Sequence, residues 1–327
     1  MACFDCILTD LQYEILIQDE TNIAMIPDIE RHLKRNQIEV TSKQNRLVMP
    51  EIGVMDFLDY CLDHMETDFI QFRLGKTHWR PLPELKEVYE TQWIDEVIQK
   101  ELLTCFFQPI VNREEETVAY EILSRFINED GTIIYPALIF EAAKKRGRLF
   151  ALDKLCRMTA VRYTEFLQGK KAFINFIPTS IYSPEHCLRS TSNLANAMGI
   201  PSSQFVFEVV ETEQVEDMEH LKRILAYYKE KGFQYALDDV GEGFNTLEIL
   251  EDLAPHYMKL DMKYVQGVSS DKNKQHVATQ FLQKAFEIGS IPLAEGVEAK
   301  EDFEWLHHAG YQLFQGYLFG KPRPIIS

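Results

Sequence analysis

The chain has 327 residues, of which 46% are apolar and 26% are charged, and its formal net charge is −17. This balance is typical of a folded globular protein and argues against a disordered chain. The acidic excess disfavours duplex nucleic acid as a partner, since affinity for phosphate backbones comes mainly from clustered Lys and Arg. At about 100 to 200 residues per domain, the length predicts one large domain with a small one, or two domains.

The sequence shows no sign of a membrane span, because no stretch approaches the roughly 18 uninterrupted apolar residues that a span requires. The first residues also lack the basic segment of a secretory leader. Six cysteines are scattered along the chain, which favours reduced thiols over a disulfide framework. We therefore expect a cytoplasmic protein without a membrane span.

Residues 1–94 are predicted to form a small α/β domain, since short strand and helix patterns alternate there without a repeating unit. We expect this domain to be regulatory, and sensory, oligomerisation and docking roles all remain open. Cys3 and Cys6, with Cys61 and His64, have the half-site spacing of a zinc site, although ordinary thiols are the simpler interpretation. A helical pattern over residues 83–104 is predicted to lead into the second domain.

Residues 95–327 are predicted to form the larger domain, in which short apolar runs alternate with segments of helical periodicity. Helices are predicted over residues 151–168, 218–232 and 273–289, where apolar residues recur at i, i+3, i+4 and i+7. The predicted strands are residues 104–111, 117–126, 171–177, 205–211, 234–240, 256–261, 291–297 and 313–319.

Eight strands with intervening helices match the size of a closed β/α barrel. Only five residues, 112–116, join the first two strands, and a parallel crossover needs about a dozen or more. The first pair should therefore run antiparallel. The sequence predicts a modified TIM-like (β/α)8 barrel with an antiparallel first strand.

Polar residues interrupt nearly every predicted strand near its C-terminal end. Taken singly, such a residue is more often a helix cap or a surface turn. In a β/α barrel, however, these strand ends meet on one face, so the side chains should converge on a single pocket. The residues are Glu121, Asn175, Glu208, Asp238, Asp239, Lys259, Asp261, Glu295 and Gln315.

So many carboxylates in one pocket repel one another unless cations are bound. An all-oxygen donor set without Cys or His favours Mg²⁺ or Mn²⁺ over Zn²⁺. The adjacent Asp238 and Asp239 suit two neighbouring ions, an arrangement that supports in-line attack at phosphorus. Lys259 and Asp261 point to one face of their strand, where the lysine could orient the attacking water. The pattern predicts a two-metal phosphodiesterase.

Over residues 97–324 the chain resembles the EAL-domain phosphodiesterases, which open bacterial cyclic di-GMP to the linear dinucleotide pGpG. The signature tripeptide stands as Glu121-Ile122-Leu123, with Arg125 after it and Gln108-Pro109 before it. The later motifs are Asn175, Glu208 to Glu213, Asp238-Asp239-Val240-Gly241, Lys259-Leu260-Asp261, Glu295 to Glu298, Gln315-Gly316-Tyr317 and Lys321-Pro322.

The resemblance implies a role for each matching residue. It implies metal ligation by Glu121, Asn175, Glu208, Asp238, Asp239 and Glu295. Lys259 and Glu295 would serve the catalytic water, and Glu211 would steady the loop after Asp239. The substrate groove would be lined by Gln108, Leu123, Arg125, Asp261, Gln315 and Pro322. A homodimer through the barrel and two Mg²⁺ or Mn²⁺ ions per site are also implied.

The sequence departs from the family pattern at two places. Ile122 replaces an alanine, and we expect this change to be tolerated. The loop Val240 to Thr246 gains Glu242 beside the paired aspartates, although both of its glycines remain. This altered loop motivates the alternative function, a catalytically weak or inactive EAL module that acts as a cyclic di-GMP receptor or a protein-docking domain. The retained Lys259 and Glu295 favour the active enzyme.

Overall fold

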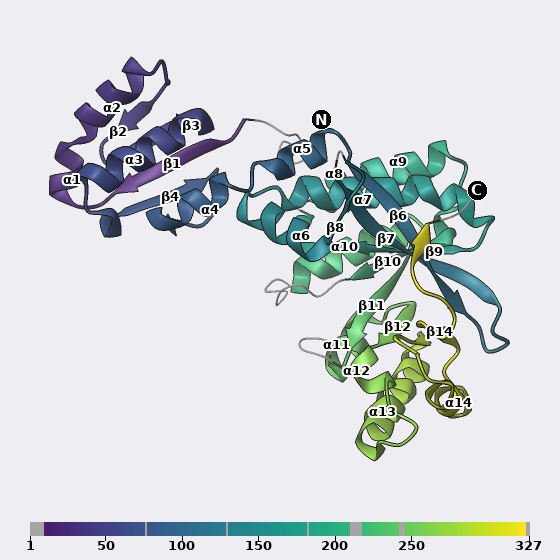
Figure 1. Cartoon of the computed structure of the whole chain (residues 1–327). Helices are drawn as coiled ribbons and strands as arrows, with labels where there is room; N and C mark the ends of the chain where they lie inside the picture. The colour runs from purple at the N-terminus through teal and green to yellow at the C-terminus, as the bar shows by residue number, and fades with distance from the viewer. Residues whose placement is uncertain are drawn as a thin grey trace. The chain divides into compact units, whose positions relative to one another are not determined.

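Figure 1 shows the computed structural model of the chain, which describes residues 10–75, 77–128, 130–181, 183–209, 218–241 and 246–324. The chain divides into two compact units. One comprises Leu103–Ile133 and Asp153–Ser327, and the other comprises Phe4–Leu102 and Ile134–Leu152. Each unit has its own hydrophobic core. Residues 134–152, which follow the second barrel strand in the sequence, therefore belong with the N-terminal unit.

Eight strands of the first unit close into a barrel. They are β6 (Leu103–Val111), β7 (Thr117–Ile127), β9 (Lys171–Phe176), β10 (Phe205–Val209), β11 (Gln234–Val240), β12 (Tyr257–Leu260), β13 (Ile291–Ala294) and β14 (Leu313–Gln315). Each strand pairs with the next, and pairing of β14 with β6 closes the ring. Two short strands, β8 (Ile133–Ile134) and β15 (Arg323–Pro324), extend the sheet beyond the ring. The predicted closed barrel is confirmed.

The strand β6 runs antiparallel to both of its neighbours, β7 and β14, while the remaining barrel pairs are parallel. The connection from β6 to β7 is too short for a crossover and forms a hairpin. Asn112 closes this turn, because its Oδ1 accepts hydrogen bonds from the backbone N–H groups of Glu114 and Glu116. The predicted antiparallel first strand is therefore confirmed.

The last two barrel strands are shorter than the sequence suggests. Residues 291–297 and 313–319 were expected to be extended, but β13 ends at Ala294 and β14 ends at Gln315. Gly296 has a φ of +64°, which turns the chain out of the ladder. At Gly316 a Cβ atom would lie 2.1 Å from the carbonyl oxygen of Val297, so only glycine permits this close approach.

Helices of the first unit follow the strands and surround the barrel. They are α7 (Leu149–Tyr163), which belongs to this unit from Asp153 onward, α8 (Pro184–Cys187), α9 (Arg189–Ala197), α10 (Met218–Glu230), α11 (Leu247–Leu253), α12 (Met262–Val265), α13 (Lys272–Ile288) and α14 (Lys300–Ala309). The helix α13 shows how the sequence sets these limits. Asp271 caps its first turn by accepting from two backbone N–H groups, and Gly289 ends it in the left-handed conformation.

The N-terminal unit is a small antiparallel sheet with helices. Its strands are β1 (Gln12–Ile17), β2 (Thr41–Lys43), β3 (Arg46–Pro50), β4 (Ile70–Leu74) and β5 (Arg80–Pro81), in the order β2-β3-β1-β4-β5. Its helices are α1 (Glu20–Ala24), α2 (Ile26–Arg35), α3 (Val54–His64), α4 (Leu85–Tyr89), α5 (Trp93–Gln99) and α6 (Pro136–Lys145). From β1 to β4 the elements follow the order β-α-β-β-α-β, with α1 and α2 counted together as one helical segment. The predicted small α/β region is confirmed.

Arg146 follows α6 and lies buried in the N-terminal unit, where it joins distant parts of the chain. Its guanidinium donates to both carboxylate oxygens of Glu51, at 2.7 and 2.8 Å, and to Asp95 Oδ2 at 2.6 Å. Tyr13 also donates to Glu51, and Arg148 donates to Asp95. Because a buried guanidinium needs such partners, this cluster fixes residues 146–148 against the N-terminal sheet region.

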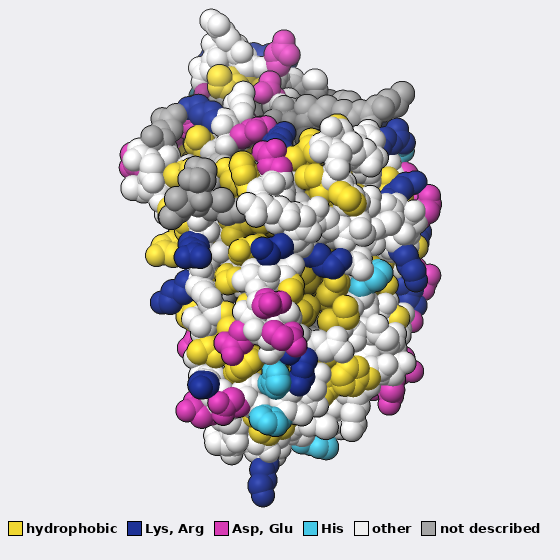
Figure 2. Space-filling model, turned by 90° about the vertical axis from the view of Figure 1, so that its right-hand side faces the viewer, with side chains coloured by type: hydrophobic (Ala, Val, Ile, Leu, Met, Phe, Trp, Pro, Cys, Tyr) yellow, Lys and Arg dark blue, Asp and Glu magenta, His cyan; other side chains and the backbone are white. Residues whose placement is uncertain are grey.

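Cys61, one of the residues with zinc-site spacing, is buried in the N-terminal core, and the ring of His64 packs against Tyr60. Burial raises the pKa of the Cys61 thiol to about 12. Cys3 and Cys6 lie outside the described residues. Across the described part of the chain, every helix is too short or too polar to cross a membrane. Figure 2 shows one face of the molecule, on which acidic and basic side chains are interspersed.

Candidate active site

The predicted site residues lie near the C-terminal ends of the barrel strands, except Glu121, which is the fifth of the 11 residues of β7. Glu121 comes from β7, Asn175 from β9, Glu208 from β10, and the two aspartates from β11. Lys259 comes from β12, Glu295 follows β13, and Gln315 ends β14. Adjacent strands bring Glu208 and Asn175 directly opposite each other in the ladder. The parallel strands thus carry residues that are far apart in the sequence to one end of the barrel.

Lys259 is the centre of the acidic cluster. Its Nζ atom lies 2.5 Å from Glu208 Oε1, 2.8 Å from Asp238 Oδ1 and 2.7 Å from Glu295 Oε1. The lysine side chain is 1% exposed and that of Glu208 is 0% exposed. At such burial water screens these charges little, so the ammonium opposes the effect that burial has on the carboxylates around it.

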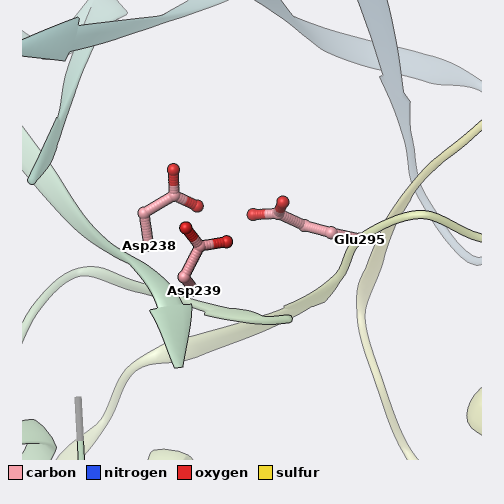
Figure 3. Close-up of side chains that lie close together, drawn as sticks. All are labelled: Asp238, Asp239 and Glu295. Atoms are coloured by element: carbon pink, nitrogen blue, oxygen red, sulfur yellow. The ribbon is translucent and has the colours of Figure 1, made fainter. Parts of the chain in front are cut away.

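Asp238 and Asp239 are consecutive residues, and both carboxylates face Glu295 (Figure 3). Side chains of successive strand residues normally point to opposite faces. Here the β11–β12 register shifts between Leu237 and Val240, and Asp239 has a φ of +48°. A β-bulge of this kind re-aims a side chain. Oxygen atoms of Asp238, Asp239 and Glu295 consequently lie within 4.8 Å of one another.

The pKa values of these carboxyl groups are displaced in different directions. Burial raises the pKa of Glu208 well above its usual value, against the opposing charge of Lys259. Burial and the neighbouring Asp238 do the same to the pKa of Glu295. Burial and the charge of Asp238 raise the pKa of Asp239 to about 7. Burial also acts upward on Asp238, but Lys259 and hydrogen bonds outweigh it, so the pKa of Asp238 is lowered.

A second group of contacts joins Glu121 to Asn175 on β9 and to Gln315 on β14. Asn175 Nδ2 donates to Glu121 Oε1 at 2.9 Å, and Gln315 Nε2 donates to Glu121 Oε2 at 2.6 Å. Gln315 also donates to Gln108 Oε1 at 3.2 Å. Gln315 Oε1 and Glu208 Oε2 are buried and accept no hydrogen bond from the described residues. These oxygens are open to a ligand of the site.

The residues expected to line a substrate groove are spread around this centre. The Arg125 guanidinium lies over the Phe106 ring at 5.3 Å, and Leu123 and Pro322 are partly exposed. Gln108 Nε2 donates to the Gly320 carbonyl at 3.4 Å. Asp261 begins α12, because its Oδ1 accepts from the Lys263 N–H at 2.7 Å. Asp261 therefore caps the first turn of α12.

The two departures from the family pattern have different outcomes. Ile122 is 2% exposed and packs in the main core between the barrel and its helices. Its side chain points away from that of Glu121, as alternation along a strand requires, so the larger residue does not crowd the site. In the altered loop, Val240, Gly241 and Thr246 are described, and residues 242–245 lie outside the described residues. Glu211 also lies outside them.

Two charged residues near the site were not predicted from the sequence. Asp153 and Arg157 lie on α7 and are 3% and 1% exposed. They form an ion pair one helical turn apart, and Asp153 Oδ1 accepts from the backbone N–H of Ile177, just after β9. The signal that could have revealed them is a pair of opposite charges at i, i+4 on the predicted helix.

The closed barrel and its buried acidic cluster define a β/α-barrel protein with a candidate functional site near the C-terminal strand ends. The family model described as the EAL domain matches residues 91–322. The chain belongs to the EAL-domain family.

Two bacterial proteins named as cyclic di-GMP phosphodiesterases are similar in sequence to this part of the chain. The probable cyclic di-GMP phosphodiesterase PdeG of Escherichia coli strain K12 is 32% identical over 231 residues, which cover 68% of this chain and 45% of PdeG. The cyclic di-GMP phosphodiesterase PdeB of Shewanella oneidensis is 26% identical over 252 residues, which cover 72% of this chain and 28% of PdeB. The chain thus spans less than half the length of these two relatives.

A solved structure is also similar. It is the c-di-GMP-bound form of a standalone EAL protein from Vibrio cholerae O395, which is 36% identical to this chain with a TM-score of 0.61. The similarity covers 68% of this chain and 92% of the Vibrio protein. This part of the chain therefore shares its fold with a solved EAL protein. Membership of the EAL-domain family supports the use of divalent metal ions.

Proposed function

We propose that the chain is a phosphodiesterase that hydrolyses cyclic di-GMP to linear pGpG with two Mg²⁺ or Mn²⁺ ions. The observation that carries this proposal is the buried group of carboxylates gathered around the single ammonium of Lys259. The names of the relatives and the ligand of the Vibrio protein support the choice of substrate.

The charges of the site fit two divalent ions. Glu121, Glu208, Asp238, Asp239 and Glu295 carry five negative charges when ionised, and Lys259 carries one positive charge, which leaves −4. Two dications supply +4. The donor set is oxygen-rich, as Mg²⁺ and Mn²⁺ prefer. The open oxygens Glu208 Oε2 and Gln315 Oε1 also fit a site that lacks part of its ligands.

In this proposal the ions are held by Glu121, Asn175, Glu208, Asp238, Asp239 and Glu295. When bound, the ions would activate the attacking water and neutralise charge that develops on the phosphoryl oxygens.

The remaining residues act on water and substrate. Glu295 accepts the proton of the water, and the neighbouring charge of Asp238 raises its affinity for that proton. Lys259 orients that water and offsets the negative charge of the transition state. Arg125, Gln108, Leu123, Asp261, Gln315 and Pro322 line the groove for the dinucleotide. We further propose that the barrel forms a homodimer and that residues 1–94 regulate it.

The test is incubation of the purified full chain with cyclic di-GMP and Mn²⁺, with the products separated by liquid chromatography and identified by mass. The proposal expects pGpG from the wild type and a loss of about 10²-fold or more in Glu295→Gln, as for loss of a general base. Tight binding of cyclic di-GMP without linear product would favour the alternative, a receptor or docking module. Light scattering on the same sample tests the dimer by its mass.

A further inference from the structure

We infer that Asp153 and Arg157 are positioning residues that hold the C-terminal end of β9, and with it Asn175, in place for the active site. This inference rests on the proposed function, because it takes Asn175 as a metal ligand. Neither residue lies among the side chains gathered around Lys259. They act from α7, which packs outside the barrel, on the backbone two residues beyond Asn175.

The backbone needs an acceptor at this point. Phe176 is the last residue of β9, and it pairs with Val209 of β10. The next residue, Ile177, lies beyond the strand. Pro178 follows and has no N–H group. The N–H of Ile177 is buried, and a buried donor without a partner is unfavourable. Asp153 Oδ1 supplies the acceptor at 2.9 Å.

The acceptor is itself held by a buried cation. Arg157 Nη2 lies 3.3 Å from Asp153 Oδ2, and Arg157 Nη1 donates to Thr191 Oγ1 on α9 at 2.5 Å. The side chains of Asp153 and Arg157 are 3% and 2% exposed. The cluster thus ties α7, α9 and the end of β9 together at one point.

Stability alone explains this pair poorly. Replacing a buried ion pair by apolar residues is often neutral or stabilising, since the pair must first lose its water. The cost is larger here because Arg157 Nε has no hydrogen-bond partner among the described residues. A geometric role accounts for charges at this position, because the pair fixes one carboxylate oxygen against one backbone N–H.

That backbone segment determines where Asn175 points. The amide nitrogen of Asn175 donates to Glu121 Oε1 at 2.9 Å, which leaves its amide oxygen as the ligand atom. The hydroxyl and the N–H of Ser180 both bond to the Ile177 carbonyl, so Ile177 is held from two sides. Outer groups that orient a ligand typically change metal affinity about 10- to 100-fold when they are removed.

Two double variants separate the hydrogen bond from the charges. Asp153→Asn with Arg157→Met removes both charges and keeps an oxygen acceptor for Ile177. Asp153→Ala with Arg157→Met removes the same charges and the acceptor. The readout is the dissociation constant of Mn²⁺, measured on the metal-free full chain by electron paramagnetic resonance of unbound Mn²⁺, beside the melting temperature of each variant.

The asparagine variant is expected to bind Mn²⁺ within about threefold of the wild type, and the alanine variant about tenfold or more weakly. Equal Mn²⁺ affinities in two folded variants would overturn the inference. Because binding is measured without turnover, a wild type that fails to make pGpG defeats the proposed function and leaves this comparison intact.

A milder pair covers the case in which the alanine variant does not fold. Thr191→Val removes the hydroxyl that accepts from Arg157, and Thr164→Val removes an equally buried hydroxyl that bonds to the Ala160 carbonyl. Thr191→Val is expected to weaken Mn²⁺ binding about threefold, with Thr164→Val unchanged, as for a lost outer contact. Identical Mn²⁺ affinities for the two valine variants would contradict the positioning role.

Discussion

Lys259 Nζ lies 2.5 Å from Glu208 Oε1, and the two side chains are 1% and 0% exposed. This ion pair is therefore formed in the interior of the barrel, where an unpaired charge is unfavourable by several kcal/mol. The lysine also lies within 3 Å of Asp238 and Glu295, at 2.8 and 2.7 Å. One ammonium is thus shared by three carboxylates, and its removal affects all three.

Lys259→Met should lower the free energy of unfolding of the metal-free chain by about 3 kcal/mol near neutral pH, the scale for breaking a buried ion pair. The loss should shrink as the pH falls towards 5, because Glu208 and Glu295 have raised pKa values and take up protons instead. Urea unfolding in EDTA measures both effects. An unchanged unfolding midpoint at neutral pH would show that Lys259 does not compensate these carboxylates.

Mn²⁺ binding should weaken as the pH falls below 7. The pKa of Asp239 is raised to about 7 in the metal-free chain, so the folded protein holds a proton there that an ion must displace. For this group alone, affinity falls about fivefold from pH 7 to pH 6 and approaches tenfold per unit below that. Calorimetry in two buffers of different ionisation enthalpy counts the protons released.

The same shift fixes the sign of the effect on stability. Because the folded pKa of Asp239 exceeds the unfolded value of about 4, its contribution to the stability of the fold is fully present below pH 4 and is lost as the pH rises through 7.

Asp239→Asn is the control variant for proton release, because it keeps a residue that tolerates the φ of +48° and removes the titration. Proton release that is the same in this variant and the wild type would exclude Asp239 as its source.

Gly296→Ala should reduce both stability and activity, because Gly296 follows Glu295 directly. At a φ of +64° an added Cβ would lie 2.4 Å from the Cβ of Met262, so the backbone beside Glu295 must move. Gly289→Ala is the matched control: it has a φ of +77° and no atom within 4 Å of the added Cβ. Both should lose about 1 kcal/mol of stability from the left-handed backbone.

Beyond that shared loss, Gly296→Ala should lose at least about tenfold in turnover, since small displacements at a catalytic centre are costly. Thermal unfolding and the pGpG assay compare the two variants. Equal activities would mean that the backbone at Gly296 does not position Glu295.

Glu51→Gln should destabilise the N-terminal unit by about 3 kcal/mol, because it removes a charged partner of the buried Arg146. Glu84→Gln is the control. It breaks the pair with Arg80, whose glutamate is 43% exposed, and should cost less than about 1 kcal/mol.

Truncation of residues 1–94 removes Glu51 altogether, so the shortened chain should also unfold at a lower temperature than the full chain. If the truncated chain were as stable as the full chain, residues 95–327 would fold as an independent domain.

Much of the fold could be predicted from the sequence, and the reasons are local. The eight apolar runs and the short connection at residues 112–116 specify the strands and the antiparallel hairpin directly. The N-terminal unit includes α6, which no pattern could indicate, because that placement depends on long-range partners such as Glu51 and Asp95 for Arg146.

At the site, the sequence identifies polar residues near strand ends but not their directions. Asp238 and Asp239 should point to opposite faces by alternation, and only the bulge with the left-handed Asp239 turns both towards Glu295. Asp153 was overlooked for a related reason: its partner is a backbone N–H at the end of another strand, which has no sequence signature.

The most direct measurement is anomalous diffraction from crystals of the full chain grown with Mn²⁺. The proposal predicts two manganese peaks about 3.5 to 4 Å apart, bounded by Asp238, Asp239 and Glu295 on one side and Glu121 with Asn175 on the other. Peaks elsewhere, or none beside these oxygens at saturating Mn²⁺, would contradict it.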